Sequence, residues 1–585
     1  MRPQAAGPAG APLAAGIDDQ YADWVRDHDT FTPADRAAIL AALPRLLDPP
    51  LISLIIVPGY EPEVDLRHTL QSLREQAYPF WEVLIPGPEP DCAAETLPGD
   101  GRLRLLGGGP YPDRATAANS ALCEAVGNYT ALLTEGDRLA PGALFELADM
   151  IARHPDTEVL YGDEDRIDFG LQRTAPWLKS GWDPDLLLSQ YYFGALALYR
   201  TARLEALGGW RSGYGLAEVY DLALRATADV LPGQVRHAAS ILVHRPAHMA
   251  RTLRDLMCHD DAIAGRRAVA EFLGPTVQVL PAPLLPSCHR IVWPVPEPAP
   301  KVSIIMPTRD LAWLLGPAAW GVLLRTVYPD FELLIVDNNS EEPATAACLA
   351  DLQRDPRVRV IPYPGPFNFS AINNAAVQQA AGEIIVLLNN DIDVIGADWL
   401  REMVSHAVRA DVGAVGARLL YADGKLQHGG VVLGPGLNAT HYMRLAERND
   451  PGYAGQQTVT RNYSAVTGAC FAIRRDVFLQ VGGLDADNLA VAFNDVDLCL
   501  RLGDHGYRVV FTPFAEMFHL ESQTRGMPDT PEKLAREMRE VDHLWRTWRA
   551  VFDHDPFHNP NMTCAWMEPL HLCKPRRPRA WQRAE

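Results

Sequence analysis

The sequence predicts an α/β protein of two tandem domains, each with a Rossmann-like, mostly parallel sheet. Three observations lead there: short apolar runs alternate with helical stretches, the chain repeats itself after about 250 residues, and seven prolines fall between residues 281 and 300. Because proline fits neither a helix interior nor a sheet interior, 281–300 is the expected linker. The predicted organisation is a helical preface (1–50), a first domain (51–280), the linker, a second domain (301–530) and a C-terminal helix with a basic tail (531–585).

The second half shows the alternation most clearly. Continuous apolar runs, typical of buried strands, occupy 302–306, 333–336, 358–361, 384–388 and 412–415. Residues with helical spacing occupy 311–326, 345–354, 370–381 and 398–409. Strands and helices in this order indicate parallel strands joined by right-handed crossovers. Ligands of such sheets bind beyond the carboxyl ends of the strands, so the residues that follow each strand are the candidates for chemistry.

The repeat indicates a duplicated domain. Residues 78–85 match 328–335, residues 119–127 match 374–382, and Asp221 to Arg225 match Asp497 to Arg501. A unit of this length is far longer than a solenoid repeat. In the preface, Thr32 is a candidate helix N-cap, followed by Pro33 in the first turn and Asp35 at the third position.

Composition excludes some classes of function. The formal net charge of −20 argues against nucleic-acid binding, which depends on clustered lysine and arginine. Nine scattered cysteines without a Cys-x-x-Cys pair are typical of a reducing compartment, and no run approaches the ~18 apolar residues of a membrane span. We therefore expect a cytoplasmic protein. The basic tail around Arg576 and Arg579 can contact an anionic membrane surface, which would place the protein peripherally on the inner face of the cell membrane.

Three polar sites in the second half carry the candidate chemistry. Asp391 and Asp393 directly follow a buried strand, where carboxylates suit Mg²⁺ or Mn²⁺ with a phosphate-bearing ligand. Asp495 begins a predicted helix, where a carboxylate can stabilise the helix or act as a general base. His519 follows a predicted strand at 508–511; a lone histidine is usually structural, so its interest comes from the other two sites.

Taken together, seven motifs in order carry a resemblance. They are Ser303 to Asp310, Val336 to Ser340, Phe367 to Asn374, Gly382-Glu383 with Leu388 to Asp391, Val466 to Ala469, Asn494 to Asp497, and His519 to Ser522. This stretch of about 225 residues resembles a family 2 glycosyltransferase of the GT-A fold, of the rhamnosyltransferase-like, surface-polysaccharide type. The family often has glutamate where this chain has Asn494, which removes one charge but keeps Asp495.

The resemblance implies roles for individual residues. Nucleotide-sugar binding would involve Pro307, Thr308, Arg309, Asp337, Asn339, Asn374 and Asp391. The acceptor would contact Gly468, Ala469 and Asn494, and a divalent metal, Mn²⁺ or Mg²⁺, would be held by Asp391, Asp393 and His519. Asp495 would be the general base of an inverting, metal-dependent transfer from a nucleoside-diphosphate sugar to a saccharide or lipid-linked saccharide acceptor, as in O-antigen or capsule synthesis.

The first half resembles the same family in outline but has lost most of these residues. Gly87 falls at the position of Asp337, Gly136 at Asp391, Arg138 at Asp393 and Val219 at Asp495. His244 alone corresponds, in this alignment, to a site residue, His519. These losses favour a non-catalytic copy that positions acceptor or partner.

Alternatives stay open. Glu135, Asp137 and the acidic run 163–165 can form a different metal site in the first half, which would make the chain bifunctional, although acidic runs are usually solvated. A nucleotidyltransferase would also use paired carboxylates and a metal, and would release pyrophosphate. The last alternative is a sugar-nucleotide-binding scaffold without turnover.

Overall fold

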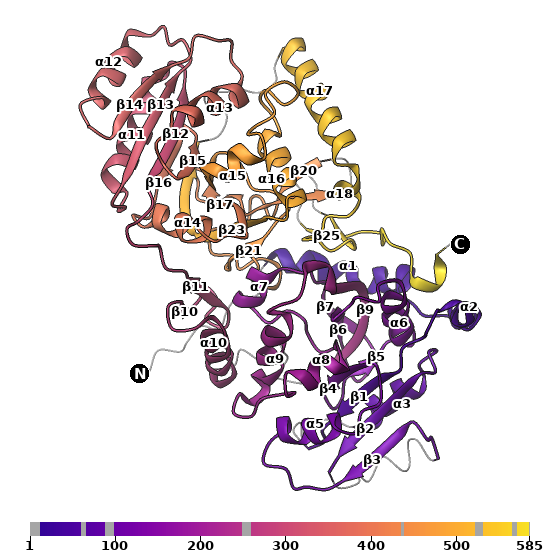
Figure 1. Cartoon of the computed structure of the whole chain (residues 1–585). Helices are drawn as coiled ribbons and strands as arrows, with labels where there is room; N and C mark the ends of the chain where they lie inside the picture. Colours follow the sequence, from indigo (N-terminus) through magenta and orange to yellow (C-terminus); the bar gives the residue numbers. More distant parts are fainter. Residues whose placement is uncertain are drawn as a thin grey trace, which may run out of the picture.

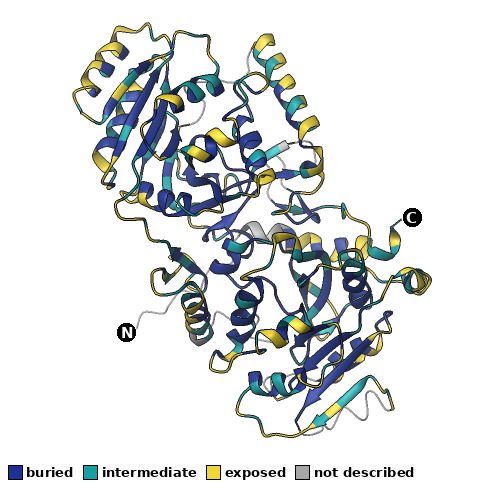
Figure 2. Cartoon of the chain, in the orientation of Figure 1, coloured by how far each residue is buried: buried dark blue, intermediate teal, exposed yellow. Residues whose placement is uncertain are grey.

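The computed structural model describes residues 12–59, 66–87, 99–247, 259–434, 438–520, 530–563 and 570–583. Two lobes stand one above the other, each built around a large sheet (Figure 1). The strands at the centre of each lobe are buried and the helices around them expose their outer faces (Figure 2). Apolar side chains therefore form a core on the faces of both sheets.

The first lobe begins with two helices and continues into alternating strands and helices. Its elements are α1 (Pro12–His28), α2 (Pro33–Ala42), β1 (Ile52–Ile56), α3 (Leu66–Arg74), β2 (Trp81–Pro86), β3 (Leu103–Gly107), α5 (Arg114–Leu122), β4 (Tyr129–Leu133), β5 (Arg138–Leu139), α6 (Ala143–Arg153), β6 (Val159–Ile167), β7 (Arg173–Trp177), α7 (Pro184–Ser189), β8 (Ala197–Arg200), α8 (Thr201–Ala206), α9 (Glu218–Thr227), β9 (Val235–Pro246) and α10 (His259–Leu273).

The second lobe repeats this order and is followed by the C-terminal helices. Its elements are β12 (Val302–Thr308), α11 (Ala312–Arg325), β13 (Phe331–Asp337), α12 (Pro343–Leu352), β14 (Val358–Pro362), α13 (Phe369–Gln379), β15 (Ile384–Leu388), β16 (Ile392–Val394), α14 (Trp399–Ala407), β17 (Val412–Leu420), β18 (Leu426–His428), β19 (Val431–Gly434), β20 (Asn438–His441), β21 (Arg461–Asn462), β22 (Cys470–Arg474), α15 (Arg475–Gln480), α16 (Asn494–Asp504), β23 (Arg508–His519), α17 (Pro531–Thr547) and α18 (Arg549–Asp553). Every strand and helix predicted in this half is present, with ends shifted by a few residues.

The two sheets share one topology. Strands run in the order β3-β2-β1-β4-β8-β6-β9-β5 in the first lobe and β14-β13-β12-β15-β22-β17-β23-β16 in the second. In each, the first four strands are parallel, and an antiparallel strand, β8 or β22, separates them from a second parallel pair. The α/β fold predicted from the sequence is confirmed, and the repeat corresponds to two copies of one sheet.

Each lobe contains an equivalent asparagine whose side chain holds one loop of that lobe in place. The Asn119 amide donates to the Trp210 carbonyl at 2.8 Å and accepts from its N–H at 2.9 Å. Asn374 makes the same two bonds to Leu484, at 2.7 and 2.9 Å. A side-chain amide that pairs with both the N–H and the carbonyl of one residue replaces a hydrogen-bonded backbone turn. This asparagine therefore fixes the loop before α9 in the first lobe and the loop before α16 in the second.

The proline-rich segment is not a featureless linker. Residues His289–Val292 form a strand, β11, which pairs with β10 (Gln278–Pro281) in a separate two-stranded sheet. The expectation of a linker throughout 281–300 was therefore wrong for this part. Proline is excluded from sheet interiors because it lacks an N–H donor, but a two-stranded ribbon has only edges, where that donor is not required.

The preface and the tail pack against the first lobe. Thr32 and Asp35 form the predicted capping box at the start of α2, with Pro33 in the first turn. The C-terminal segment returns from the second lobe past α1 to this region (Figure 1). There the Trp581 indole donates to Asp35 at 2.7 Å, and Arg579 forms an ion pair with Asp29.

Three arginines of the tail make contacts within the chain, and the membrane contact expected for the tail stays a prediction. Arg583 pairs with Asp149 at 2.7 Å, and Arg576 donates to the Pro560 carbonyl at 3.1 Å. Burial lowers the pKa of Arg579 to about 10. Its charge faces acidic groups of the first lobe, so it does not form part of an exposed basic patch.

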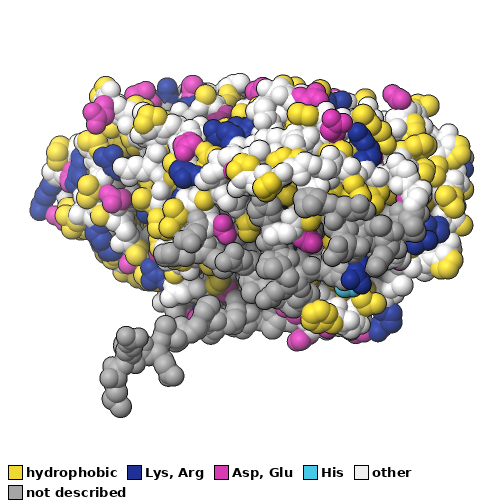
Figure 3. Space-filling view, turned by 90° about the horizontal axis from the view of Figure 1, so that it is seen from below, with side chains coloured by type: hydrophobic (Ala, Val, Ile, Leu, Met, Phe, Trp, Pro, Cys, Tyr) yellow, Lys and Arg dark blue, Asp and Glu magenta, His cyan; other side chains and the backbone are white. Residues whose placement is uncertain are grey.

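On the face seen in Figure 3, lysine and arginine side chains stand among aspartates and glutamates and do not gather into one patch. None of the helices in the described part of the chain has the length and apolar content needed to cross a membrane.

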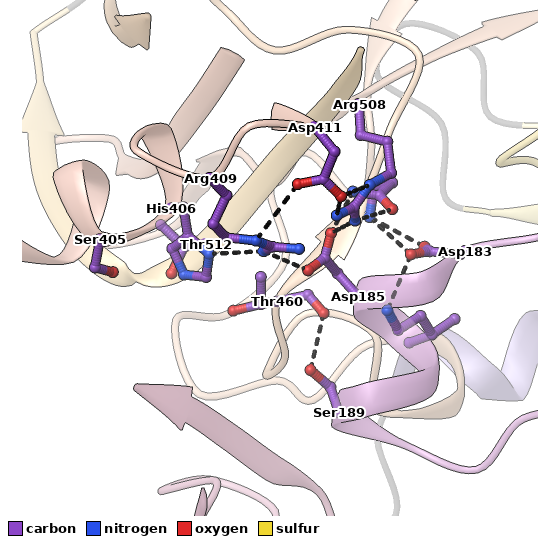
Figure 4. A network of polar contacts seen from close by, with 12 residues as sticks. Asp183, Asp185, Ser189, Ser405, His406, Arg409, Asp411, Thr460, Arg508 and Thr512 are labelled. Atoms are coloured by element: carbon purple, nitrogen blue, oxygen red, sulfur yellow. Dashed lines mark hydrogen bonds and ion pairs between the residues drawn. The ribbon is translucent and has the colours of Figure 1, made fainter. Parts of the chain in front are cut away.

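Buried charges join the two lobes (Figure 4). Asp183 and Asp185, at the start of α7, face the second lobe. Asp185 pairs with Arg409 at 2.7 Å and with Arg508, and accepts from the Asn462 amide at 2.8 Å. Burial alone would raise the pKa of Asp185, but the two arginines hold it far below its ordinary value. The carboxylate is therefore ionised and shared between two cations across the interface.

We predict that Asp185→Ala lowers the free energy of unfolding by about 3 kcal/mol, because it leaves Arg409 and Arg508 without a buried counterion. Urea denaturation followed by tryptophan fluorescence measures this. Asp411→Ala is the matched control: Asp411 also pairs with Arg508, but its side chain is 58% exposed, so its loss should cost less than about 1 kcal/mol. Equal effects of the two substitutions would contradict the importance of the buried pair.

Candidate active site of the second lobe

The carboxyl ends of β12, β13 and β15 meet at one edge of the sheet. The Thr308 carbonyl accepts from the Asn338 N–H at 2.9 Å, and the Asn390 amide donates to the Thr308 hydroxyl at 3.0 Å. Three loops from separate strands are thereby tied together. This is the place where the α/β topology predicts a ligand.

The residues expected to bind the nucleotide surround this edge. Pro307 and Thr308 end β12, and the Arg309 side chain beyond them is half exposed. Asp337 ends β13, where its carboxylate accepts the Ser340 N–H at 3.1 Å. Asn339 has a left-handed backbone with φ of 58°, and its amide donates to the Gly365 carbonyl at 3.2 Å. Apart from Asn374, the residues expected to bind the nucleotide therefore lie in one cluster of loops. The Arg309 guanidinium is a cation within this cluster.

Asn374 lies outside this cluster of loops and holds the loop at Leu484 in place. Both polar atoms of its amide are used by the Leu484 peptide group, as described above. The matching contact of Asn119 in the first copy has the same geometry. The contact gives Asn374 a structural function in place of the nucleotide contact expected from the sequence.

Asp391 and His519 come together at the centre of the site. Asp391 is 3% exposed and its Oδ1 lies 3.1 Å from His519 Nε2. No donor in the described residues forms a hydrogen bond to that oxygen. His519 Nδ1 lies 2.7 Å from the Gln427 Oε1, and the Gln427 amide donates back to the His519 carbonyl at 3.3 Å.

The Gln427 contact selects one tautomer of a neutral His519 ring. An amide oxygen can only accept, so the proton of a neutral imidazole sits on Nδ1 and leaves Nε2 with a free lone pair. The Asn389 amide lies 3.3 Å from Nε2, and Asp391 Oδ1 lies 3.1 Å from the same nitrogen. A carboxylate oxygen and a neutral imidazole nitrogen are both ligand types that divalent cations accept.

Asp393 does not join this pair. Its carboxylate forms an ion pair with Arg325 of α11 at 2.7 Å and is about half exposed. Asp391 lies in the turn before β16, whereas Asp393 lies within the strand next to α11, so the two carboxylates have different surroundings. The described residues contain no group of three or more metal-ligating side chains, and the metal role expected for Asp391, Asp393 and His519 stays a prediction.

The Gly468-Ala469 loop, expected to contact the acceptor and called the acceptor loop below, lies beside the strand that leads to Asp391. Antiparallel pairing of β15 with β22 places Leu388 opposite Cys470, and the Asn389 N–H donates to the Ala469 carbonyl at 3.0 Å. The residue before Ala469, Gly468, donates its N–H to Asp495 Oδ2 at 2.7 Å. Asp391, Ala469, Gly468 and Asp495 are therefore linked through a short series of contacts, so the two acidic residues converge.

Asp495 is held at the first turn of α16. Its Oδ1 accepts the Val496 N–H at 2.9 Å and its Oδ2 the Gly468 N–H. These two contacts orient the carboxylate. The position at a helix N-terminus also favours the ionised form. A hydroxyl of a bound acceptor can meet this side chain over Gly468, where a larger side chain would intrude.

The C-terminal helix supports this turn. The Glu540 carboxylate on α17 accepts the N–H groups of Val491 and Ala492, at 3.2 and 2.8 Å. Asn494, expected to contact the acceptor, is buried and donates to the Val491 carbonyl at 3.3 Å. The Trp548 indole, beyond α17, donates to Asp497 at 2.8 Å. The segment after residue 530 therefore positions the loop that precedes Asp495.

Sequence reasoning missed Gln427, His428 and Glu540. His428 Nε2 accepts the Thr467 N–H at 3.4 Å and so supports the acceptor loop from β18. None of the three lies in a recognisable motif, and β18 pairs with β17 only in the folded chain. No local pattern in the sequence identifies residues that act by holding another side chain.

The first lobe carries a different set at the same place. Leu139 pairs with Val243 where Val394 pairs with Met517. Counting along both strands, His244 corresponds to Phe518, and Arg245 corresponds to His519. The alignment of His244 with His519 was therefore wrong by one residue. In a strand, a shift of one residue moves a side chain to the opposite face.

The acidic run of the first lobe is internal. Asp165 lies 2.6 Å from His244 Nδ1, 2.5 Å from the Tyr21 hydroxyl and 2.5 Å from Arg173. Glu164 pairs with Lys179 at 3.0 Å. Asp163 accepts from the Lys179 N–H and the Asn559 amide and contacts His237, with distances of 2.7 to 2.8 Å. The run is therefore buried, whereas acidic runs are usually solvated. No group of three or more metal-ligating side chains is present among the described residues.

Comparison with known proteins identifies the second lobe. Residues 303–482 match the family model described as "Glycosyl transferase family 2". A family 2 glycosyltransferase domain is present in this chain. The match includes Asp391 and Gly468 and ends before Asp495 and His519, which lie outside it.

Curated relatives extend across both lobes. An uncharacterized protein of Sinorhizobium fredii is 41% identical over 88% of this chain and 58% of its own length. The O-antigen biosynthesis protein RfbC of Myxococcus xanthus is 37% identical over 91% of this chain and 42% of its own length. The chain thus spans about half the length of these relatives. Their matches are long enough to include both lobes, so the tandem arrangement is shared.

Two further proteins match one domain. The N-acetylglucosaminyl-diphospho-decaprenol L-rhamnosyltransferase of Mycobacterium tuberculosis is 29% identical over 33% of this chain and 68% of its own length. The solved mannosyltransferase PcManGT of Pyrobaculum calidifontis, in complex with GDP-Man and Mn²⁺, is 18% identical, with a TM-score of 0.30, and covers 44% of this chain and 67% of its own.

Proposed function

We propose that the second lobe transfers a sugar from a nucleoside-diphosphate sugar to a saccharide acceptor, with inversion, in the synthesis of a surface polysaccharide. The proposal is supported by the contact of Asp391 with His519 and by the Gly468 loop, which links this edge of the sheet to Asp495, beside residues that match the family 2 glycosyltransferase model. The name of the RfbC relative supports the surface-polysaccharide setting.

The donor would lie along the loops of β12 and β13. Thr308 and Asp337 offer a hydroxyl and a carboxylate for the base and ribose, and Arg309 offers a cation for the diphosphate. Asp391 and His519 would hold a divalent metal, Mn²⁺ or Mg²⁺, because both present acceptor atoms to one point. When bound, that cation offsets the charge of the diphosphate leaving group.

Asp495 would act on the acceptor. Its carboxylate accepts the proton of the acceptor hydroxyl as that oxygen forms a bond to the anomeric carbon. The bond from that carbon to the diphosphate oxygen breaks at the same time, and the nucleoside diphosphate leaves with the electron pair. A single displacement from the opposite face inverts the anomeric configuration. The Gly468 and Val496 N–H groups keep the carboxylate in place throughout.

We predict that Asp495→Asn lowers turnover by about 10²- to 10⁴-fold and leaves donor binding largely unchanged, because an amide cannot accept the proton. Transfer is measured by product formation and donor binding by calorimetry. Asp504→Asn makes the same chemical change at the exposed end of the same helix and should retain full turnover. Wild-type turnover in Asp495→Asn, or transfer by an isolated first lobe, would instead support activity in the first lobe.

Chelation should abolish transfer, and Mn²⁺ or Mg²⁺ should restore it. The structure adds a sharper comparison: Asp391→Ala should prevent restoration at any metal concentration that saturates the wild type, whereas Asp393→Ala should stay within about threefold of wild-type activity, since Asp393 is paired with Arg325. Full activity after rigorous removal of metal would refute the metal requirement. Release of pyrophosphate in place of a nucleoside diphosphate would identify a nucleotidyltransferase.

Gln427→Leu should weaken Mn²⁺ binding by about 10- to 100-fold, because His519 then loses the acceptor that orients its ring. Free Mn²⁺ measured by electron paramagnetic resonance gives a readout that does not depend on turnover. Gln427→Glu retains an acceptor oxygen at the same place and should bind Mn²⁺ nearly as well as the wild type. If the leucine variant bound Mn²⁺ like the wild type, His519 would not be a ligand oriented by Gln427.

A further inference from the structure

The first lobe contains a cavity of about 580 Å³, including its open mouth. Its wall includes Gly194 and Ala195 before β8, Val219 on α9 and Arg245 on β9. The cavity belongs to the copy that has lost the catalytic carboxylate.

This cavity occupies the place of the active site in the second lobe. Tyr129 pairs with Arg200 where Ile384 pairs with Arg474, so the Gly194-Ala195 segment corresponds to Gly468-Ala469. Val219 corresponds to Asp495 and Arg245 to His519, from the sequence repeat and the strand register. The duplicated fold has therefore kept the crevice, including its Gly-Ala wall, and has replaced the groups proposed for catalysis.

The replacements change the charge of the site. Where the second lobe has a carboxylate and an imidazole, the first lobe has Gly136 and the guanidinium of Arg245. A second guanidinium, that of Arg114 on α5, also lines the cavity and is 7% exposed. Guanidinium groups are the side chains best suited to bind carboxylate and phosphate groups, because their fork of N–H donors matches two oxygens.

Each of these arginines also has an acidic neighbour. Arg114 lies 3.1 Å from Glu218 and Arg245 lies 3.3 Å from Asp137. Burial raises the pKa of Glu218 to about 7 and that of Asp137 to about 6, although the arginines oppose this. Near neutral pH Glu218 therefore neutralises Arg114 only in part. Glu164, which also interacts with Arg245, is paired with Lys179.

One polar group in the wall points to a ligand. Tyr199 on β8 lines the cavity and is 3% exposed, and its hydroxyl has no hydrogen-bond partner among the residues that the structure describes. A buried hydroxyl without a partner costs free energy, which a bound ligand or water can recover. Tyr191 and Trp210 provide aromatic surface beside it.

We propose that this cavity binds a sugar bearing a carboxylate or phosphate group, without a metal ion. The anionic group would lie between Arg114 and Arg245, and the sugar ring would lie against Trp210, with the Tyr199 hydroxyl as a further partner. A ligand of this kind is either an acidic residue of the acceptor saccharide or a sugar phosphate. The site would hold the ligand without turnover, because Val219 supplies no base.

Calorimetry on the full chain in EDTA tests the proposal with three probes: glucuronate, glucose 1-phosphate and neutral glucose. We expect saturable binding of at least one charged sugar and none of glucose. Val219→Phe, which fills the cavity from a half-buried helix position, should abolish it, whereas Val219→Ala should retain it. Arg114→Gln should weaken it by about 10-fold or more, and also serves if the phenylalanine variant does not fold.

Preference for glucuronate would identify an acceptor residue as the source, and preference for glucose 1-phosphate a sugar phosphate. Absence of binding by both charged sugars, or binding unaffected by Val219→Phe and Arg114→Gln, would overturn the proposal. The inference rests on the proposed function only for its relation to the acceptor. Asp495→Asn should leave this binding intact while transfer is lost, so failure of one proposal can be told apart from failure of the other.

Discussion

One structural constraint underlies both lobes: an antiparallel strand lies between two groups of parallel strands. In the second lobe that strand is β22, between β15 and β17. Because β22 runs against β15, its first residues lie beside the last residues of β15, which are followed by Asp391. The loop before β22 contains Gly468, which holds Asp495. Without this reversal, the acceptor loop would lie at the far edge of the sheet, and the proposed base and metal-binding pair would be separated.

The two copies show which parts of this arrangement belong to the fold and which to the chemistry. The amide of Asn119 or Asn374, and the hydrogen bond from Ser53 to Glu82 or from Ser303 to Glu332, recur in both lobes and hold equivalent loops. The charged and polar groups proposed for catalysis in the second lobe do not recur in the first. A contact between a side chain and the backbone stabilises the fold whatever the ligand, so it survives when the site changes. Residues whose only partner is a ligand are free to change with it.

Much of the fold was predictable because burial leaves a continuous apolar run for each parallel strand, and because the repeat could be read directly. The site was predictable where a residue follows a strand or begins a helix, as Asp391 and Asp495 do. Prediction failed where the outcome depended on register or distant partners. Asp393 was paired with Asp391 by spacing, but Arg325 of α11 takes its charge. His244 was aligned by identity with His519, whereas strand pairing assigns that position to Arg245.

Buried charged groups also hold the first lobe to the second. Asp183 accepts the Asn462 N–H, and Asp185 lies between Arg409 and Arg508, all at the junction. If the second lobe were separated, these arginines would lose the carboxylate that neutralises them, and the apolar surface around them would meet water. We therefore expect the lobes to stabilise each other, whether or not the cavity of the first lobe binds a ligand. This mutual dependence gives a physical reason for the two lobes to remain together in relatives that match both.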